Sequence, residues 1–294
     1  MPELPDIVVY IESLEARILG QTLERVKILN PFVLRSFAPP LEEAHGKPVS
    51  SLHRLGKRII IGLQPDYFFV IHLMIAGRFR WLEPNAKPPG KIGLASFHFP
   101  NGTLLLTEAG TKRLASIHLD KGSDALAAFD MHGLEVLDAD LITFSQHLTK
   151  ENHTLKRALT DPRSFSGIGN AYSDEILHRA KLSPIAQTQK LSAEEIAALF
   201  DAAKATLLEW TDRLRLQARD KFPEKVTAFR PEMAVHGRFG LPCPVCANPV
   251  QRIVYATNET NYCARCQTGG VILADRALSR LLKKSWPRAI DDLE

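Results

Sequence analysis

The four cysteines constrain the fold of this chain more than any other feature. They form two Cys-x-x-Cys pairs, Cys243 with Cys246 and Cys263 with Cys266, and sixteen residues separate the pairs. Each pair can bind a tetrahedral ion from a tight turn, and a β-hairpin of this length brings the pairs together. We therefore expect one zinc ion held by four thiolates. Two disulfides are the alternative, which conflicts with a start that lacks the pattern of a secretory signal.

A zinc ion with four thiolate ligands has no open coordination position, so it is expected to be structural. This argues against a zinc-dependent hydrolase. The hairpin would lie in a basic segment, because eight Lys or Arg stand against two Asp or Glu between Gly237 and Ile290, a net charge of +6, whereas the whole chain carries +4. Such a concentration of charge suits a phosphate backbone, and a solvated basic face is the alternative explanation.

The rest of the chain divides into a β-rich part and a helical part. Strand-like segments cover residues 57–63, 67–74, 95–99 and 103–107, and the last two flank Asn101-Gly102, which is typical of a hairpin turn. An amphipathic helix is expected over residues 5–20. Between residues 137 and 214 the pattern is helical, and Ser192 with Glu195 predicts a capping box.

We therefore predict an α+β multidomain fold. It comprises an N-terminal β-sandwich with flanking helices at residues 1–130, a helical domain at 131–235, a four-cysteine zinc finger at 236–285 and a tail at 286–294. The longest apolar runs fall short of the ~20 residues that a membrane span needs. We expect a cytoplasmic protein, a monomer, with no membrane partner and no nucleotide cofactor.

A glycine-containing turn in the helical part is a candidate anion site. The sequence from Ser166 to Asn170 reads Ser-Gly-Ile-Gly-Asn, and its glycines let the backbone approach a ligand closely. Asn170 can cap the helix that follows, whose first N–H groups point outward. Lys156 and Arg163 nearby favour phosphate. The alternative is a joint between helices that needs glycine for packing alone.

Four motifs together resemble one protein family. Pro2-Glu3-Leu4-Pro5, the Gly56-Lys57 pair, the turn at 166–170 and the hairpin end Tyr262-Cys263 occur in the same order in the formamidopyrimidine-DNA glycosylase and endonuclease VIII family of base-excision repair enzymes. The resemblance runs from Met1 to about Lys284. It implies a β-sandwich, a helix-two-turn-helix domain and a zinc hairpin, with double-stranded damaged DNA as the partner in a bacterial cytoplasm.

The resemblance also implies roles for residues. Removal of Met1 would make Pro2 the N-terminal nucleophile, which attacks sugar C1′ and expels the damaged base, with Glu3 as acid and base. Lys57 completes the catalytic set by contacting phosphate. The predicted DNA contacts in the turn and nearby are Asn170, Gly169 and Lys156. The implied activity is that of a bifunctional glycosylase and abasic-site lyase acting on oxidised bases.

The chain departs from the family pattern at the hairpin tip and at the helix wedge. Asn258 stands where the family carries a phosphate-binding arginine, so β-elimination is expected to exceed δ-elimination. The wedge residues that fill the hole left by the flipped base are altered, and this chain offers Ile75 or Met74. A second loop offers Lys112 or Arg113 with Leu114. These changes keep two alternatives open, namely a DNA-binding protein without the chemistry and a family member with lyase activity alone.

Overall fold

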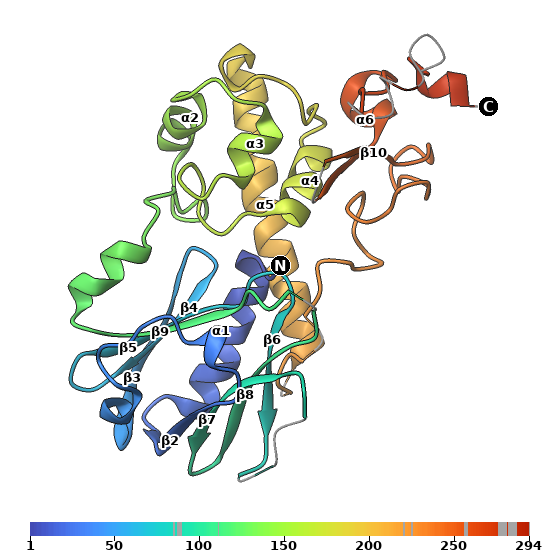
Figure 1. The fold of residues 1–294 in the computed structure, drawn as a ribbon. Coiled ribbons are helices and arrows are strands. Elements are labelled where there is room, and N and C mark those ends of the chain that lie inside the picture. Colours follow the sequence, from blue (N-terminus) through green and yellow to red (C-terminus); the bar gives the residue numbers. More distant parts are fainter. Residues whose placement is uncertain are drawn as a thin grey trace. The chain divides into compact units, whose positions relative to one another are not determined.

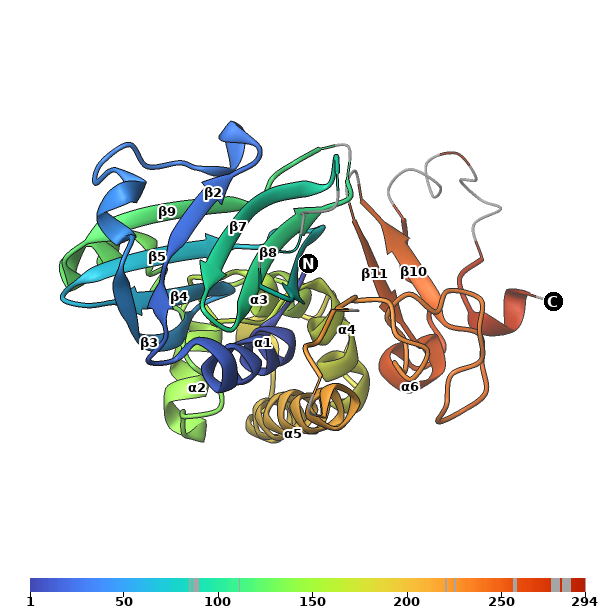
Figure 2. The same cartoon turned by 90° about the horizontal axis from the view of Figure 1, so that it is seen from below.

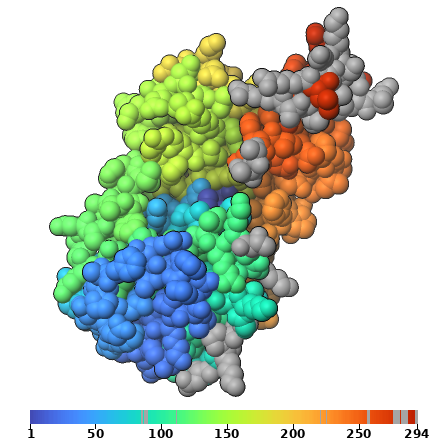
Figure 3. Space-filling view, in the orientation of Figure 1, coloured from blue at the N-terminus to red at the C-terminus, as the bar shows by residue number. Residues whose placement is uncertain are grey.

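A computed structural model describes most of the chain. The described residues are 1–84, 86, 90–110, 112–219, 221–224, 226–255, 258–275, 281 and 287–293, and the others are grey in Figure 3. Four cations of the predicted basic segment lie outside the described residues. They are Arg276, Arg280, Lys283 and Lys284.

The chain folds into two compact units, Met1–Met131 with Trp210–Thr227, and His132–Glu209 with Ala228–Glu294. The predicted domain boundaries differ from this division in one respect, since they place residues 210–227 in the helical domain and not with the first unit. The physical reason is local packing: Val9, Leu214 and Ala218 form one buried cluster. Thus the C-terminal end of helix α5 (Ala193–Ala218), which carries Leu214 and Ala218, belongs to the first unit.

The first unit is a β-sandwich, as predicted (Figures 1 and 2). One sheet has the order β1-β3-β4-β5-β9, with bounds Thr22–Leu23, Lys47–Leu55, Arg58–Leu63, Tyr67–His72 and Ser116–Lys121. The other has the order β2-β7-β8-β6, with bounds Arg25–Ile28, Gly93–Phe99, Gly102–Glu108 and Gly77–Leu82. Neighbouring strands are antiparallel, and Phe99 pairs with Gly102 across the predicted hairpin turn. Short 3₁₀ helices connect them, η1 (Pro31–Val33), η2 (Leu41–Ala44) and η3 (Ser123–Phe129).

Helix α1 (Leu4–Ile18) closes the core of the sandwich, which confirms the predicted amphipathic helix. Ile7, Ile11, Leu14 and Ile18 recur at three- or four-residue spacing, so they share one face and pack with side chains of both sheets. Val8, predicted on that face, is only half-buried because its neighbours turn toward the core instead. This packing fixes the N-terminal end of α1 to the sandwich.

The second unit begins with helices, as predicted for this part of the chain. These are α2 (Leu141–Thr149), α3 (Leu155–Thr160), α4 (Asn170–Arg179) and α5 (Ala193–Ala218), with η4 (Thr188–Lys190) before α5. The capping box at the start of α5 is confirmed. The Ser192 N–H donates to Glu195 Oε2 at 2.9 Å, and the Glu195 N–H donates to Ser192 Oγ at 3.2 Å.

The second unit ends with the cysteine segment. Strands β10 (Gln251–Val254) and β11 (Glu259–Tyr262) form an antiparallel hairpin, followed by α6 (Ala264–Thr268) and the 3₁₀ helix η6 (Ile290–Leu293). Within the part of the chain that the structure describes, no helix has both the length and the apolar character to span a bilayer.

Candidate active site and zinc finger

The N-terminal end of α1 is buried and held by a helix cap. Pro2 is buried, and Glu3 and Asp6 are only 2% and 3% exposed. Glu3 is the N-cap residue, and its backbone N–H donates to Asp6 Oδ2 at 3.0 Å. An acidic side chain in the first turn also interacts favourably with the helix dipole. The cap therefore fixes the backbone next to Pro2.

Two cations act on the amino group at this end of the chain. Burial lowers the pKa of the Met1 α-amino group, Glu3 and Asp6 raise it, and Arg78 and Lys57 lower it further. Lys57 lies in the turn between β3 and β4, where Gly56 has a φ of 61°. The sandwich thus brings Lys57 into the electrostatic surroundings of the N-terminal residues.

His72 and Arg78 belong to the same surroundings, although no sequence motif assigned a role to either of them. His72 ends β5, and burial lowers its pKa to about 4, with Arg58 and Lys57 lowering it further. The imidazole is therefore neutral at pH 7. Arg78 follows Gly77 directly, and a cation at the end of a glycine turn was the signal available in the sequence.

The turn between β5 and β6 presents the predicted apolar wedge. The Gly77 N–H donates to Leu73 O at 2.9 Å, and a Cβ atom on Gly77 would lie 2.2 Å from that oxygen, so the turn requires glycine there. Met74 has a left-handed φ of 52°, and the side chain of Ile75 is 63% exposed. Of the two predicted candidates, Ile75 is therefore the exposed tip.

The second predicted wedge loop, residues 112–115, is anchored by Glu108. The buried Glu108 carboxylate accepts the N–H groups of Leu114 and Ala115 at 3.0 and 3.1 Å. Lys112 and Arg113 are exposed, and Arg113 Nη2 donates to Lys91 O. The loop thus combines an anchored end with exposed cations.

In the second unit the glycine-containing turn precedes α4, but the predicted cap is wrong by one residue. Gly169 is the N-cap, and Asn170 is the first helical residue. The side chain of Asn170 bonds elsewhere, since its Nδ2 donates to Glu259 O at 2.9 Å. This contact uses one of the two amide N–H groups and joins the turn to the zinc hairpin. Gly167 has a φ of 79°, which glycine readily adopts.

Lys156 does not match its predicted role as a phosphate contact. Its Nζ donates to Asn170 O at 2.7 Å, Ser173 Oγ at 2.8 Å and Asp174 Oδ1 at 2.5 Å. An ammonium group has three N–H donors, so all of them are engaged. The residue is only 8% exposed. Lys156 therefore stabilises the turn from within the protein.

Asp174 extends this network to the zinc hairpin. Its Oδ2 accepts hydrogen bonds from the Asn261 N–H at 3.1 Å and lies 2.8 Å from His236 Nδ1. The adjacent carboxylate of Glu175 accepts the N–H groups of residues 234–236 at 2.7 to 2.9 Å. Two neighbouring acids of α4 thus order the segment that leads into the hairpin.

The hairpin tip carries Asn258, where the resemblance implied an arginine. Asn258 is exposed, and its carbonyl accepts the Tyr255 N–H at 2.8 Å, while residues 256 and 257 lie outside the described residues. Two arginines of this segment are each paired with an acidic residue. Arg252 pairs with Glu259 at 3.2 Å, and Arg265 pairs with Asp291 at 2.9 Å. The Arg252 pair offsets the negative charge of Glu259 beside the tip.

The cysteine cluster fits one zinc ion. All four Sγ atoms lie within 4.8 Å of one another, with Cys246 and Cys263 3.3 Å apart and Cys243 and Cys266 3.9 Å apart. Tetrahedral Zn–S bonds of about 2.3 Å separate sulfur atoms by about 3.8 Å. The alternative of two disulfides is excluded, because those bonds need about 2.05 Å. His178 Nε2 lies 3.2 Å from Cys243 Sγ, so α4 also contacts the metal ligands.

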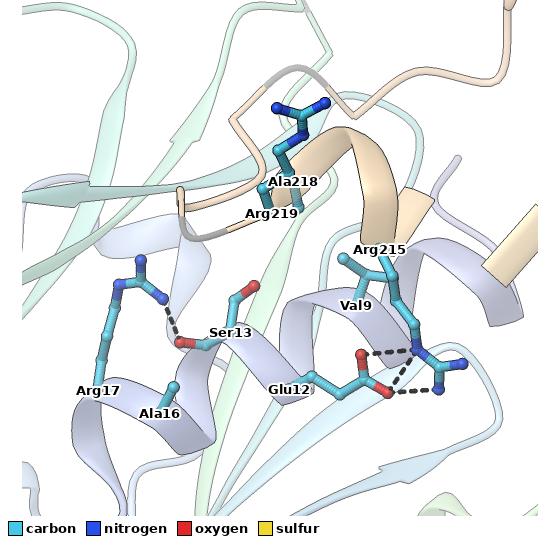
Figure 4. Close-up of a pocket in the computed structure, with 8 residues that line it drawn as sticks. All are labelled: Val9, Glu12, Ser13, Ala16, Arg17, Arg215, Ala218 and Arg219. Carbon is cyan, nitrogen blue, oxygen red and sulfur yellow. Dashed lines mark hydrogen bonds and ion pairs between the residues drawn. The ribbon is translucent and has the colours of Figure 1, made fainter. Parts of the chain in front are cut away.

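A pocket of ≈ 480 Å³ lies in the first unit beside α1 and the end of α5 (Figure 4). It contains none of the predicted site residues. Arg215 Nη2 binds Glu12 Oε1 at 2.6 Å, and its Nη1 binds Asp212 at 2.7 Å, while Arg17 donates to Ser13 O. Of these contacts, only the Arg215–Glu12 pair joins α1 to α5, since each of the other two lies within one helix.

The fold and the cysteine cluster together define the class of this protein. An N-terminal β-sandwich is followed in the chain by a helical unit that ends in a four-cysteine zinc finger. Three family models match the chain in this order. They are the formamidopyrimidine-DNA glycosylase N-terminal domain over residues 1–117, the formamidopyrimidine-DNA glycosylase H2TH domain over residues 133–213, and the zinc finger found in FPG and IleRS over residues 240–269.

Individual relatives agree with these matches. A formamidopyrimidine-DNA glycosylase of Thermus thermophilus is 33% identical over 281 residues, which cover 92% of this chain and 100% of the relative. A solved complex between the Lactococcus lactis Fpg and DNA containing an abasic site has a TM-score of 0.80 at 26% identity, covering 90% of this chain and 99% of that one. A complex of the same wild-type protein with DNA containing an oxidised pyrimidine has a TM-score of 0.79 at 25% identity, covering 91% and 100%.

The chain therefore belongs to the formamidopyrimidine-DNA glycosylase family of DNA-repair glycosylases, and its zinc is structural.

Proposed function

We propose that this protein is a bifunctional DNA glycosylase and abasic-site lyase that uses Pro2 as its nucleophile. The observation that carries the proposal is the buried, capped N-terminal end of α1. Pro2 and Glu3 lie there next to the Met1 α-amino group, whose pKa is lowered by burial and by the charges of Arg78 and Lys57. Burial lowers the pKa of an amino group at this end of the chain, which increases its neutral, nucleophilic fraction. Removal of Met1 by hydrolysis of the Met1–Pro2 peptide bond frees the nitrogen of Pro2, which is then a secondary amine in the same buried place.

The reaction then proceeds in two steps. The Pro2 nitrogen forms a bond to sugar C1′ as the bond to the base breaks, and Glu3 supplies the proton that the opening sugar or departing base takes up. The C1′–O4′ bond then breaks and the nitrogen loses its proton, which leaves a charged iminium that acidifies C2′. Loss of a C2′ proton then expels the 3′ phosphate by β-elimination. One residue in this way serves both activities.

The DNA contacts divide between the two units. Lys57 binds a phosphate beside the flipped nucleotide, and Ile75 fills the gap in the base stack, assisted by Lys112 and Arg113. Asn170 and Gly169 offer backbone and amide N–H groups at the start of α4. Lys156 supports this turn and is not proposed as a phosphate contact.

The substrate class is an oxidised base in double-stranded DNA. Support comes from the relatives, one of which is a formamidopyrimidine-DNA glycosylase while another is solved with an oxidised pyrimidine. Because Asn258 carries no charge, β-elimination exceeds δ-elimination. The alternative function is a DNA-binding or lyase-only member of the family, which the altered wedge residues favour.

Borohydride trapping separates these functions. The enzyme should form a covalent adduct with both lesion DNA and abasic-site DNA, and Pro2→Gly should reduce it strongly. A lyase-only protein traps on abasic DNA alone, and a binding protein traps on neither. Resolved products should show β-elimination in excess, and Asn258→Arg should increase the δ-product. A dominant δ-product from the unaltered chain would contradict the role given to Asn258.

A further inference from the structure

We propose that Arg78 is a positioning residue that holds the wedge turn, Leu73–Gly77, against the segment after α5 and thereby sets the position of the Ile75 tip. This inference rests on the proposed function, because it concerns how the lesion is presented to Pro2. The role is one of positioning, because the guanidinium of Arg78 donates to backbone carbonyl groups.

The guanidinium of Arg78 bonds to three carbonyl groups from two parts of the chain. Its Nε donates to Val226 O, while its Nη1 donates to Gly77 O at 2.6 Å and to Ile75 O at 3.2 Å. The Ile75 carbonyl belongs to the exposed tip itself, so the guanidinium acts directly on the backbone that carries the wedge side chain. Val226 is 148 positions away in sequence, so this contact is a long-range tie.

Both ends of this tie are anchored in the sandwich core. Thr107 Oγ1 donates to Arg78 O at 3.1 Å, and the next residue, Phe79, donates its N–H to the hydroxyl of the buried Tyr10 at 3.3 Å. Val226 is 7% exposed and belongs to the core cluster that contains Tyr10. A half-buried guanidinium between two fixed points has little freedom, so the carbonyl of Ile75 is held with it.

The geometry requires an arginine. A guanidinium presents several N–H groups in a rigid planar fork, whereas the single ammonium of lysine is a point charge on a flexible stem. Arg78→Lys keeps the positive charge near the N-terminal amine but loses the fork that spans Val226 and the turn. The substitution therefore separates the charge of this side chain from its positioning.

The test compares Arg78→Lys with the unaltered protein under single turnover. Excision of an oxidised base requires the wedge, whereas trapping on a preformed abasic site requires no base to be expelled. We expect excision to fall about tenfold or more while trapping changes less than about threefold, since misplacement of a positioning group costs rate without removing the nucleophile. Arg17→Lys is the matched control, because Arg17 also donates to a backbone carbonyl, that of Ser13, and both rates should stay within about twofold.

Three results would overturn the inference. If Arg78→Lys excises the base within twofold of the unaltered rate, the planar guanidinium of Arg78 is dispensable. If excision and trapping fall equally, the substitution acts on the N-terminal amine and not on the wedge turn. If the unaltered protein neither excises an oxidised base nor forms a trapped adduct, the proposed function fails. Amide hydrogen exchange then tests the contact between Arg78 and the wedge turn independently of activity. Exchange at residues 75–77 should rise about tenfold in Arg78→Lys and not in Arg17→Lys, and unchanged exchange contradicts the tie.

Discussion

The backbone N–H of Glu3 donates to the carboxylate of Asp6 at 3.0 Å, so the first turn of α1 determines where the residue beside Pro2 lies. Asp6 is the third residue of the helix. Its position shows a structural task, which is to cap the helix whose start carries the proposed chemistry.

Asp6→Ala should therefore affect both stability and catalysis. Loss of the cap should lower the free energy of unfolding by about 1 kcal/mol. Because Glu3 loses the hydrogen bond that positions its backbone, the rate of base excision should fall by about tenfold, which is more than the loss of stability explains. Denaturant unfolding and single-turnover excision measure the two effects.

Asp140→Ala is the matched control, because Asp140 caps α2 by accepting the Thr143 N–H at 2.7 Å. It should lower stability by a similar amount and leave excision unchanged. Equal excision by Asp6→Ala and Asp140→Ala would contradict the positioning of Glu3 by Asp6.

Lys57 and Lys156 should differ in the salt dependence of DNA binding. Lys57→Met removes a proposed phosphate contact, so the slope of log K against log salt concentration should flatten by about 0.9. Lys156→Met should leave that slope unchanged but cost about 3 kcal/mol of unfolding free energy, because it leaves the buried Asp174 without its ion pair. Binding titrations at several salt concentrations, with parallel unfolding curves, distinguish the two. If Lys156→Met also flattened the slope of log K against log salt concentration, Lys156 would contact phosphate after all, as the sequence predicted.

Zinc removal should weaken DNA binding strongly. The ion ties the hairpin together, and the hairpin is joined to α4 through Asn170, Asp174 and His178. Chelation should release one zinc ion per chain and weaken DNA affinity by about tenfold or more, and zinc addition should restore both. Unchanged affinity in the zinc-free protein would show that the hairpin is not part of the DNA-binding surface.

The stability of the sandwich should depend on pH through His72. Burial lowers the pKa of His72 to about 4 in the folded protein, whereas an unfolded histidine titrates near 6.5. Between these values the unfolded state binds more protons, so stability is complete above pH ~6.5 and falls by up to about 3 kcal/mol as pH decreases toward ~4. His72→Gln should flatten this dependence. Parallel curves for His72→Gln and the unaltered protein would contradict the assignment.

The sequence predicted the elements whose determinants are local. Helix α1, the hairpin at Asn101-Gly102, the capping box at Ser192 and the cysteine cluster follow from spacing and turn chemistry alone. The order of the β-rich, helical and four-cysteine parts also followed from the sequence pattern, and the matching family models bear out the family assignment.

The sequence failed where long-range contacts decide. Asn170 looks like a cap, but its amide bonds to β11, and Lys156 looks like a phosphate ligand, but its neighbours in space are Ser173 and Asp174. Arg78 carried no local signal beyond its glycine neighbour, since its partner Val226 lies far along the chain. Such pairings follow from tertiary packing, which no short motif encodes.

The central claim is that Pro2 forms the covalent bond to DNA. It is tested most directly by trapping the protein on abasic-site DNA with borohydride, digesting the adduct and locating the sugar by peptide mass spectrometry. We predict a modified N-terminal peptide that begins at Pro2 and lacks Met1. A sugar found on Lys57 or another lysine, or on a peptide that still begins with Met1, would contradict the account.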